Sequence, residues 1–150
     1  MGRPMTEAET RAAIVTEAMS WIGTPYHSHA RIKGVGVDCA QLPAAIYEAV
    51  GLIDPVNPSY SPDWMLHRDE EKFLSYVLPQ AREISEAEVL PGDMVIWRYG
   101  RTYSHAAIVI DLPQVVHAVI RGSAVILADI TRDSDLADRP RRYFTVFGER

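Results

Sequence analysis

The chain has 150 residues, of which 47% are hydrophobic and 23% are charged. This length suits one domain with a real core and is too short for two ordinary ones, so we predict a single domain over residues 1–150. The net charge of −5 excludes a global basic field that would attract nucleic acid or anionic lipid. We therefore expect neither nucleic acid nor a membrane among its partners.

Cysteine content and the N-terminus narrow the possibilities further. Cys39 is the single cysteine, which excludes an internal disulfide framework and a multi-cysteine zinc site. No apolar run reaches transmembrane length, and residues 1–9 lack the basic start and apolar stretch of a secretory signal. We expect synthesis in the cytoplasm without export by that route. The short basic stretches Arg31 to Lys33 and Arg139 to Arg142 are predicted to be a solvated loop and a solvated strand end.

Two helices are predicted in the first third of the chain. Thr6 and Glu9 resemble a capping box, and apolar residues follow helical spacing from there to a stop at Gly23. Residues 24–37 are predicted to be a loop. A second helix is expected to start at Asp38 or Cys39 and to end at Gly51, with Pro43 tolerated in or just past its first turn.

The rest of the chain changes from helical to strand-like patterns. Residues 54–62 contain three prolines and are expected to be irregular, and a short helix is plausible near 69–77. Five short β-branched or aromatic runs follow, over residues 94–97, 106–110, 115–120, 124–130 and 143–147. Helices first and strands later predict an α+β fold, with N-terminal helices packed on an antiparallel β-sheet.

Cys39, His105 and His117 are the candidate catalytic residues. Cys39 lies where a loop turns into a helix, so the helix N-terminus and a nearby imidazolium are expected to lower its thiol pKa and make it a nucleophile. His105 on a strand is the candidate general base, and later the general acid toward the leaving amine. His117, on the neighbouring strand of an expected hairpin, is the candidate that orients the His105 ring. Taken singly, each of these residues is more often a core residue.

Five motifs in order resemble the NlpC family of cell-wall cysteine peptidases, which have a papain-like fold. The resemblance runs from about Ala13 to Phe147. Its motifs are Trp-Ile-Gly-Thr-Pro-Tyr (21–26), Gly-Val-Asp-Cys (36–39), Leu-Pro-Gly-Asp-Met-Val-Ile-Trp (90–97), Ser-His-Ala-Ala-Ile-Val-Ile (104–110) and Val-His-Ala (116–118).

The resemblance implies roles for individual residues. Cys39 attacks, His105 is the base and His117 orients it. Tyr26 matches a tyrosine that lines the family's active site and is assigned to the substrate or the oxyanion. Asp38 has two interpretations, a helix cap or a substrate contact, and capping is the safer one. The substrate implied is peptidoglycan or a muropeptide, cut at an amide of the stem peptide, usually between D-γ-glutamate and a diamino acid.

Two departures from the family pattern affect specificity. Gln41 replaces a glycine of the common Cys-Ser-Gly sequence and is expected to reshape or narrow the substrate pocket. A longer basic loop over residues 27–33 replaces a Tyr-x-x-Gly-Gly turn and resembles the family's phage-tail and prophage members. It makes phage tail proteins candidate partners and a virion tail the candidate location.

Other classes of function were weighed against this one. His27 and His29 form a His-x-His pair to which Cys39 or His67 could add a ligand. The segment is predicted to be a loop without clustered acids, so we expect no metal and no cofactor. A non-catalytic tail-assembly or wall-binding module with the same fold is the first alternative, and it has no need of the three candidate residues. A lipid-directed acyl hydrolase or transferase is the second, and its relatives often place the histidine before the cysteine.

Overall fold

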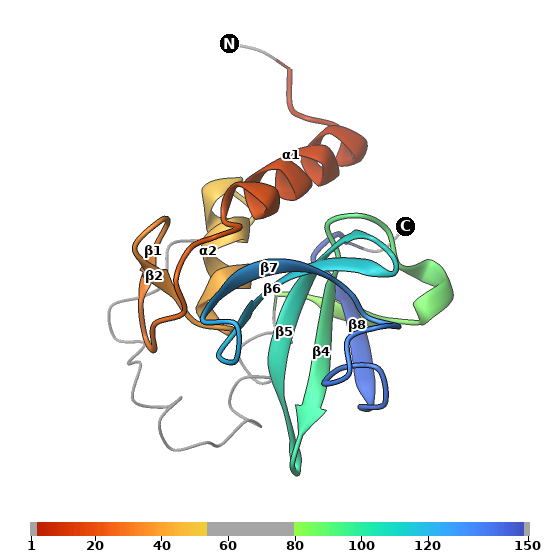
Figure 1. Ribbon diagram of the computed structural model, residues 1–150. Helices are drawn as coiled ribbons and strands as arrows, with labels where there is room; N and C mark the ends of the chain where they lie inside the picture. The colour runs from red at the N-terminus through yellow and green to blue at the C-terminus, as the bar shows by residue number, and fades with distance from the viewer. Residues whose placement is uncertain (1–2, 54–79, 149–150) are drawn as a thin grey trace.

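Two helices and a curved antiparallel sheet make up most of the computed structural model, which describes residues 3–53 and 80–148 (Figure 1). The elements in chain order are α1 (Glu7–Ser20), β1 (Arg31–Ile32), β2 (Gly36–Val37), α2 (Gln41–Ala49), β3 (Arg82–Ile84), the 3₁₀ helix η1 (Glu86–Glu88), β4 (Met94–Tyr99), β5 (Thr102–Asp111), β6 (Gln114–Val119), β7 (Ala124–Asp129) and β8 (Arg141–Thr145).

The main sheet has the strand order β3-β8-β4-β5-β6-β7, and every neighbouring pair is antiparallel. Consecutive strands from β4 to β7 are therefore neighbours, as in a simple meander, while β8 returns to the other side of β4. Both helices lie to one side of the sheet, and the small β1–β2 hairpin lies beside α2 (Figure 1). The predicted α+β class, with helices packed on an antiparallel sheet, is confirmed.

The first helix begins where the sequence predicts. The hydroxyl of Thr6 accepts a bond from Glu9 N at 3.1 Å, and the Glu9 carboxylate accepts one from Thr6 N at 2.9 Å. This reciprocal capping box satisfies two amide hydrogens that the helix itself cannot use. The helix ends at Ser20, three residues before Gly23, whose φ of 92° suits the turn that follows.

The second helix begins slightly later than predicted. Its regular part starts at Gln41, because Asp38 to Ala40 form a turn held by the Asp38 carboxylate. Pro43 is the third helical residue, where its missing amide hydrogen costs little, as predicted. The helix closes at Val50 and Gly51, and Gly51 has a φ of 78°.

Three short strands were not predicted, namely β1, β2 and β3. The segment 24–37 was expected to be a loop, yet Arg31 pairs with Val37 and Ile32 pairs with Gly36. The five predicted strands are all present, and β5 extends earlier than expected, from Thr102. The irregular segment expected at 54–62 and the helix expected near 69–77 lie outside the described residues.

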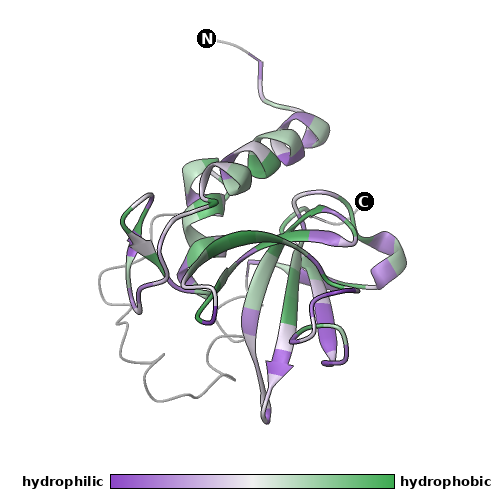
Figure 2. Cartoon of the chain, in the orientation of Figure 1, coloured by the Kyte–Doolittle hydropathy of each residue, from purple (hydrophilic) through white to green (hydrophobic). Residues whose placement is uncertain are grey.

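Alternating side chains give the sheet an apolar cluster on each face. The face toward the helices contributes Met94, Ile96, Ala106, Ile108, Val116 and Phe144, which pack with Ile14 and Leu42 of the helices. The opposite face contributes Val95, Trp97, Ala107, Val109 and Val115, which pack with Ile130 and Leu136 of the segment after β7. The end of β4 and the start of β8 are hydrophilic (Figure 2). The segment around residues 131–140 therefore covers the outer face and leads to that polar end.

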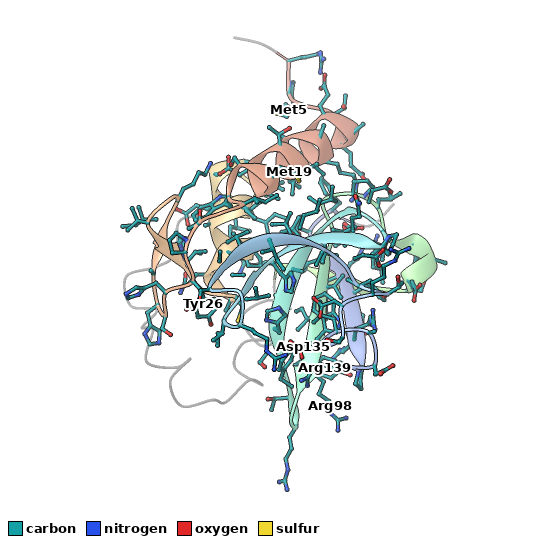
Figure 3. The ribbon with its side chains drawn as sticks, in the orientation of Figure 1. Met5, Met19, Tyr26, Arg98, Asp135 and Arg139 are labelled. Atoms are coloured by element: carbon teal, nitrogen blue, oxygen red, sulfur yellow. The ribbon has the colours of Figure 1, made fainter. Side chains whose placement is uncertain are left out.

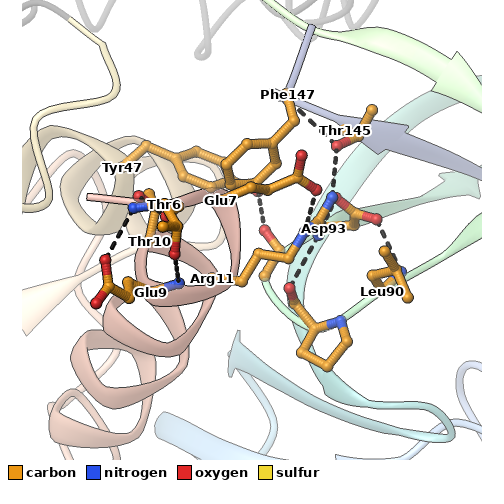
Figure 4. A network of polar contacts seen from close by, with 12 residues as sticks. Thr6, Glu7, Glu9, Thr10, Arg11, Tyr47, Leu90, Asp93, Thr145 and Phe147 are labelled. Carbon is orange, nitrogen blue, oxygen red and sulfur yellow. Dashed lines mark hydrogen bonds and ion pairs between the residues drawn. The ribbon is translucent and has the colours of Figure 1, made fainter. Parts of the chain in front are cut away.

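A buried ion pair joins α1 to the sheet. Arg11 donates to Asp93 Oδ1 at 2.9 Å and to the Pro91 carbonyl at 2.9 Å, and Asp93 is fully buried (Figure 4). Asp93 Oδ2 accepts from Leu90 N at 2.9 Å, so both carboxylate oxygens have donors. The Arg11 guanidinium also lies 4.2 Å from the centre of the Phe147 ring. One arginine thus connects the first helix, the start of β4 and the C-terminal segment.

Within the described residues, no helix is both long and apolar enough to cross a membrane.

Candidate active site

Strands β5 and β6 bring the two candidate histidines into direct contact. Ile108 pairs with Val116 in this hairpin, which places His105 and His117 on the same face of the sheet. His105 Nε2 lies 2.8 Å from His117 Nδ1, and the two rings are nearly perpendicular at 81°. Both residues are buried. The predicted contact between the far ring nitrogen of His105 and His117 is confirmed, and each ring fixes the orientation of the other.

Cys39 lies at the turn that leads into α2. The Asp38 carboxylate accepts bonds from Ala40 N at 3.1 Å and Gln41 N at 2.8 Å, which is how an N-cap residue satisfies the first helical amides. The Cys39 sulfur is 3.9 Å from the carbonyl oxygen of Ser104, the residue before His105. In the described part of the chain no hydrogen bond joins the thiol to the His105 ring. Such catalytic contacts often tighten only when substrate binds.

The Cys39 thiol is protonated in this arrangement. Burial, followed by the negative charge of Asp38, raises its pKa to about 12, while bonds from the Tyr26 hydroxyl and nearby backbone amides act in the opposite direction. The sequence predicted a lowered pKa. That prediction is wrong for the resting structure, because it counted the helix N-terminus but neither the loss of solvation nor the capping carboxylate beside the sulfur.

The two histidines are neutral in the same arrangement. Burial lowers the pKa of His105 to about 3, with smaller contributions from His117 and the Arg139 charge. Burial also lowers the pKa of His117 to about 4, although the Asp133 charge opposes that shift. If His105 Nδ1 is to accept the thiol proton, its Nε2 carries hydrogen and donates to His117 Nδ1. His117 Nε2 is then buried with no hydrogen-bond partner among the described residues.

Tyr26 connects the segment before Cys39 to the turn between β6 and β7. Its backbone N donates to the Ser123 carbonyl at 2.8 Å, and its backbone pairs with Val37, two residues before Cys39. Its hydroxyl acts on the Cys39 thiol and favours the thiolate form. Burial, followed by the charges of Cys39 and Asp38, raises its pKa. Tyr26 is half-exposed (Figure 3), so its neutral hydroxyl is accessible as a hydrogen-bond donor to substrate.

The other two residues assigned to substrate have contacts inside the protein. Asp38 is buried and, besides capping α2, accepts a bond from His29 N at 2.7 Å. This bears out its predicted role as a helix cap. Gln41 is also buried, and its side-chain oxygen accepts from Arg31 Nε at 3.0 Å. The contact ties β1 to the first turn of α2, so Gln41 supports the wall of the site through this hairpin.

Two side chains near His105 were missed in the sequence. The ring of Tyr99 at the end of β4 is 5.3 Å from the His105 ring, and burial raises the pKa of its hydroxyl, while the Arg139 charge opposes that shift. The guanidinium of Arg139 lies 3.6 Å from the centre of the Tyr99 ring. The predicted strand ended at Trp97, and Arg139 was placed in a solvated strand end, so only the tertiary packing reveals either residue.

The basic stretches are more structured than predicted. Arg31 is half-buried and forms an ion pair with Glu48, while Lys33 forms one with Glu17 at 2.8 Å. Arg141 donates to the carbonyls of Leu136 and Ala137. These residues brace the β1–β2 hairpin and the segment before β8. Both stretches are partly exposed, as predicted, but Arg31 and Ile32 form a strand and not a loop.

The His-x-His pair shows no metal-binding arrangement in the described residues. His29 has a φ of 65° and uses its backbone to bond Asp38, and His27 Nδ1 is 3.3 Å from the Ser28 carbonyl oxygen. No group of three or more His, Cys, Asp or Glu side chains in residues 3–53 and 80–148 is arranged to hold a metal. His67, the other ligand considered, lies outside those residues.

A cysteine at a helix start and a histidine pair on a facing antiparallel sheet define the papain-like class of folds. The sequence model of the NlpC/P60 family matches residues 23–135, which contain Cys39 and both histidines. The chain belongs to the NlpC/P60 family. No curated protein matches the chain by sequence.

Solved structures support the same fold. The NlpC/p60 domain of the peptidoglycan hydrolase SagA is 24% identical with a TM-score of 0.60, over 88% of this chain and 96% of that one. NlpC1 from Trichomonas vaginalis is 15% identical with a TM-score of 0.66, over 95% of this chain but only 45% of that one. RipD from Mycobacterium tuberculosis is 15% identical with a TM-score of 0.61, over 92% of this chain and 98% of that one. It is described as a non-catalytic NlpC/p60 domain protein adapted to peptidoglycan binding.

Proposed function

We propose that this chain is a cysteine peptidase that cleaves an amide bond in peptidoglycan stem peptides. One observation carries the proposal, namely the buried contact of 2.8 Å between His105 and His117, with the Cys39 sulfur 3.9 Å from the carbonyl oxygen of the residue before His105. A histidine oriented by a second polar ring, next to a thiol, is the arrangement that nucleophilic catalysis requires. Membership of the NlpC/P60 family supports peptidoglycan as the substrate.

The neutral resting state implies the order of proton transfers. Cys39 is protonated and His105 is unprotonated, so the thiol proton moves to His105 Nδ1 as the sulfur attacks the amide carbonyl carbon. The tetrahedral intermediate then collapses, the C–N bond breaks, and His105 returns the proton to the leaving amine. Water hydrolyses the resulting thioester with His105 as base. His117 keeps the reacting nitrogen of His105 aimed at the sulfur throughout.

The bond between D-γ-glutamate and a diamino acid is the one we propose. It rests on the resemblance of the motifs around Cys39, His105 and His117 to cell-wall peptidases of the NlpC type. The test is mass spectrometry of defined muropeptides after incubation with the protein, with Cys39→Ala as the inactive control. New amino termini on the diamino acid support this bond. Products cut at the sugar–lactyl amide would show an amidase instead.

A non-catalytic wall-binding role is the second candidate. It is favoured by the raised pKa of Cys39 and by the presence of the non-catalytic RipD among the structural neighbours. The same experiment separates the two functions. A binding module would sediment with purified sacculi and release no fragments, whereas a peptidase would release them in a Cys39-dependent manner.

Delivery by a phage tail is a separate proposal about where the enzyme works. It is supported by the resemblance of the 27–33 loop to phage-tail and prophage members of the family. A tail component is expected to co-purify with particles and to cut intact sacculi. A recycling enzyme would be absent from particles and active on soluble muropeptides alone.

A further inference from the structure

Arg139 is held in a fixed position beside the candidate active site. Its guanidinium is 3.6 Å from the centre of the Tyr99 ring, and its Nε donates to the Asp135 carbonyl at 2.6 Å. A stacked guanidinium with one anchored nitrogen has little freedom left to lose when it binds a ligand. Figure 3 shows Arg139 and Asp135 at the same end of the sheet, with Arg98 close by.

The remaining donors of Arg139 have no acceptor in the described part of the protein. No described carboxylate forms an ion pair with it within 4 Å, although two acids are close in sequence. Asp135 pairs with Arg121 at 3.8 Å, and Asp133 Oδ1 accepts from Asp135 N at 2.9 Å. Arg139 is only half-exposed. A planar, half-buried guanidinium with unused parallel N–H groups has the geometry that binds a carboxylate with two hydrogen bonds.

The position of Arg139 relative to the reacting groups is set by Tyr99. The Tyr99 ring contacts Arg139 on one side and is 5.3 Å from the His105 ring. Tyr99 is thus the side chain that links the Arg139 guanidinium to the candidate base. An anion held by Arg139 would therefore flank an amide bound between Cys39 and His105.

The geometry points to Arg139 as a specificity residue that binds a free carboxylate next to the scissile amide of the substrate. The inference rests on the proposed peptidase function and specifies its substrate as an acidic peptide. A γ-linked glutamyl residue retains its α-carboxylate a few bonds from the scissile carbonyl, and a diamino acid on the other side can carry a second carboxylate. Either source has the chemistry that Arg139 recognises.

Three synthetic stem peptides test the inference: one with both carboxylates free, one amidated at the glutamyl α-carboxylate, and one amidated at the diamino acid. Arg139→Gln is expected to lower kcat/KM on the fully acidic peptide by on the order of 10- to 100-fold, mainly through KM. On the peptide whose amidation removes the recognised carboxylate, wild type and Arg139→Gln should be equal. Which peptide gives that equality identifies the carboxylate.

Arg98→Gln is the matched control, because Arg98 is an exposed arginine at the same end of the sheet. It should leave all three kcat/KM values close to those of the wild type. Arg139→Lys keeps the charge but not the planar fork, and it should recover only part of the loss. An equal loss by Arg139→Gln on all three peptides, or no loss on any, would overturn the inference.

Binding measurements distinguish a failure of the proposed peptidase function from a failure of the proposed carboxylate site at Arg139. In the Cys39→Ala background, calorimetry should show that Arg139→Gln weakens binding of the fully acidic peptide. It should not weaken binding of the peptide whose amidation removes the carboxylate that Arg139 recognises. That result supports the carboxylate site even if the wild type cleaves no peptide. If the Cys39→Ala protein binds the fully acidic peptide and both amidated peptides with equal affinity, the carboxylate site is rejected, whether or not the wild type cleaves any peptide.

Discussion

The Cys39 thiol has two opposing influences on its charge. Backbone amides and the Tyr26 hydroxyl favour the thiolate, but burial and the Asp38 carboxylate outweigh them and raise the pKa to about 12. The same carboxylate caps α2. The residue that positions the nucleophile therefore also suppresses its ionisation, and thiolate forms only as the proton is transferred to His105.

Alkylation of Cys39 by iodoacetamide should accordingly be slow at neutral pH. With a pKa of about 12, the thiolate fraction at pH 7 is on the order of a thousand-fold below that of an ordinary cysteine, and the rate should keep rising with pH well past 9. Asp38→Asn removes the negative charge and should increase the rate at pH 7. Asp111→Asn, an exposed acid on β5, is the control and should not. Fast alkylation of the wild type at pH 7 would indicate a preformed ion pair with His105.

The two histidines should differ in what their removal costs. His105→Ala removes the proton carrier and is expected to lower kcat by on the order of 100- to 10,000-fold. His117→Asn retains an oxygen that can accept the hydrogen bond from His105 Nε2, so kcat should fall only about tenfold. Steady-state kinetics on a muropeptide, with circular dichroism to verify folding, measures both. A larger loss for His117→Asn in a folded protein would show that the roles are reversed.

Among the helices and strands, the long periodic segments were predictable from the sequence and the short ones were not. The capping box of α1 and the β5–β6 hairpin have strong local signals, and both are present. The two-residue strands β1 and β2 have no periodicity to detect, and their pairing depends on contacts such as that of Arg31 with Gln41. Arg139 and Tyr99 meet only because the segment after β7 folds back over the end of β4. That contact follows from tertiary packing.

The attachment of α1 to the sheet should depend on Arg11. Arg11→Met leaves the fully buried Asp93 carboxylate without its cation, which should reduce the free energy of unfolding by about 3 kcal/mol. Urea denaturation followed by tryptophan fluorescence measures the change. Arg3→Met removes an exposed ion pair with Glu9 on the same helix and should change stability little. Similar effects of the two substitutions would mean that the buried network does not anchor α1.

The whole molecule should lose stability in mild acid because of the catalytic pair. The folded state lowers the pKa of His105 to about 3 and that of His117 to about 4, while the unfolded chain binds these protons near pH 6.5. Between these values unfolding takes up protons, so the stabilisation is fully present above about pH 6.5 and is lost as the pH falls toward 4. The arrangement that supplies a neutral base therefore makes the fold acid-sensitive.

His117→Asn tests this linkage, because it removes one of the two titrating groups. The free energy of unfolding of the wild type should fall between pH 6.5 and pH 4, and the His117 contribution to that fall is on the order of a few kcal/mol. The variant should be less stable than the wild type at pH 7, yet its stability should depend less steeply on pH in this window. Urea titrations at several pH values measure both slopes. Parallel curves for the two proteins would show that His117 is not held neutral by the fold and would remove the basis for a neutral His105–His117 pair at rest.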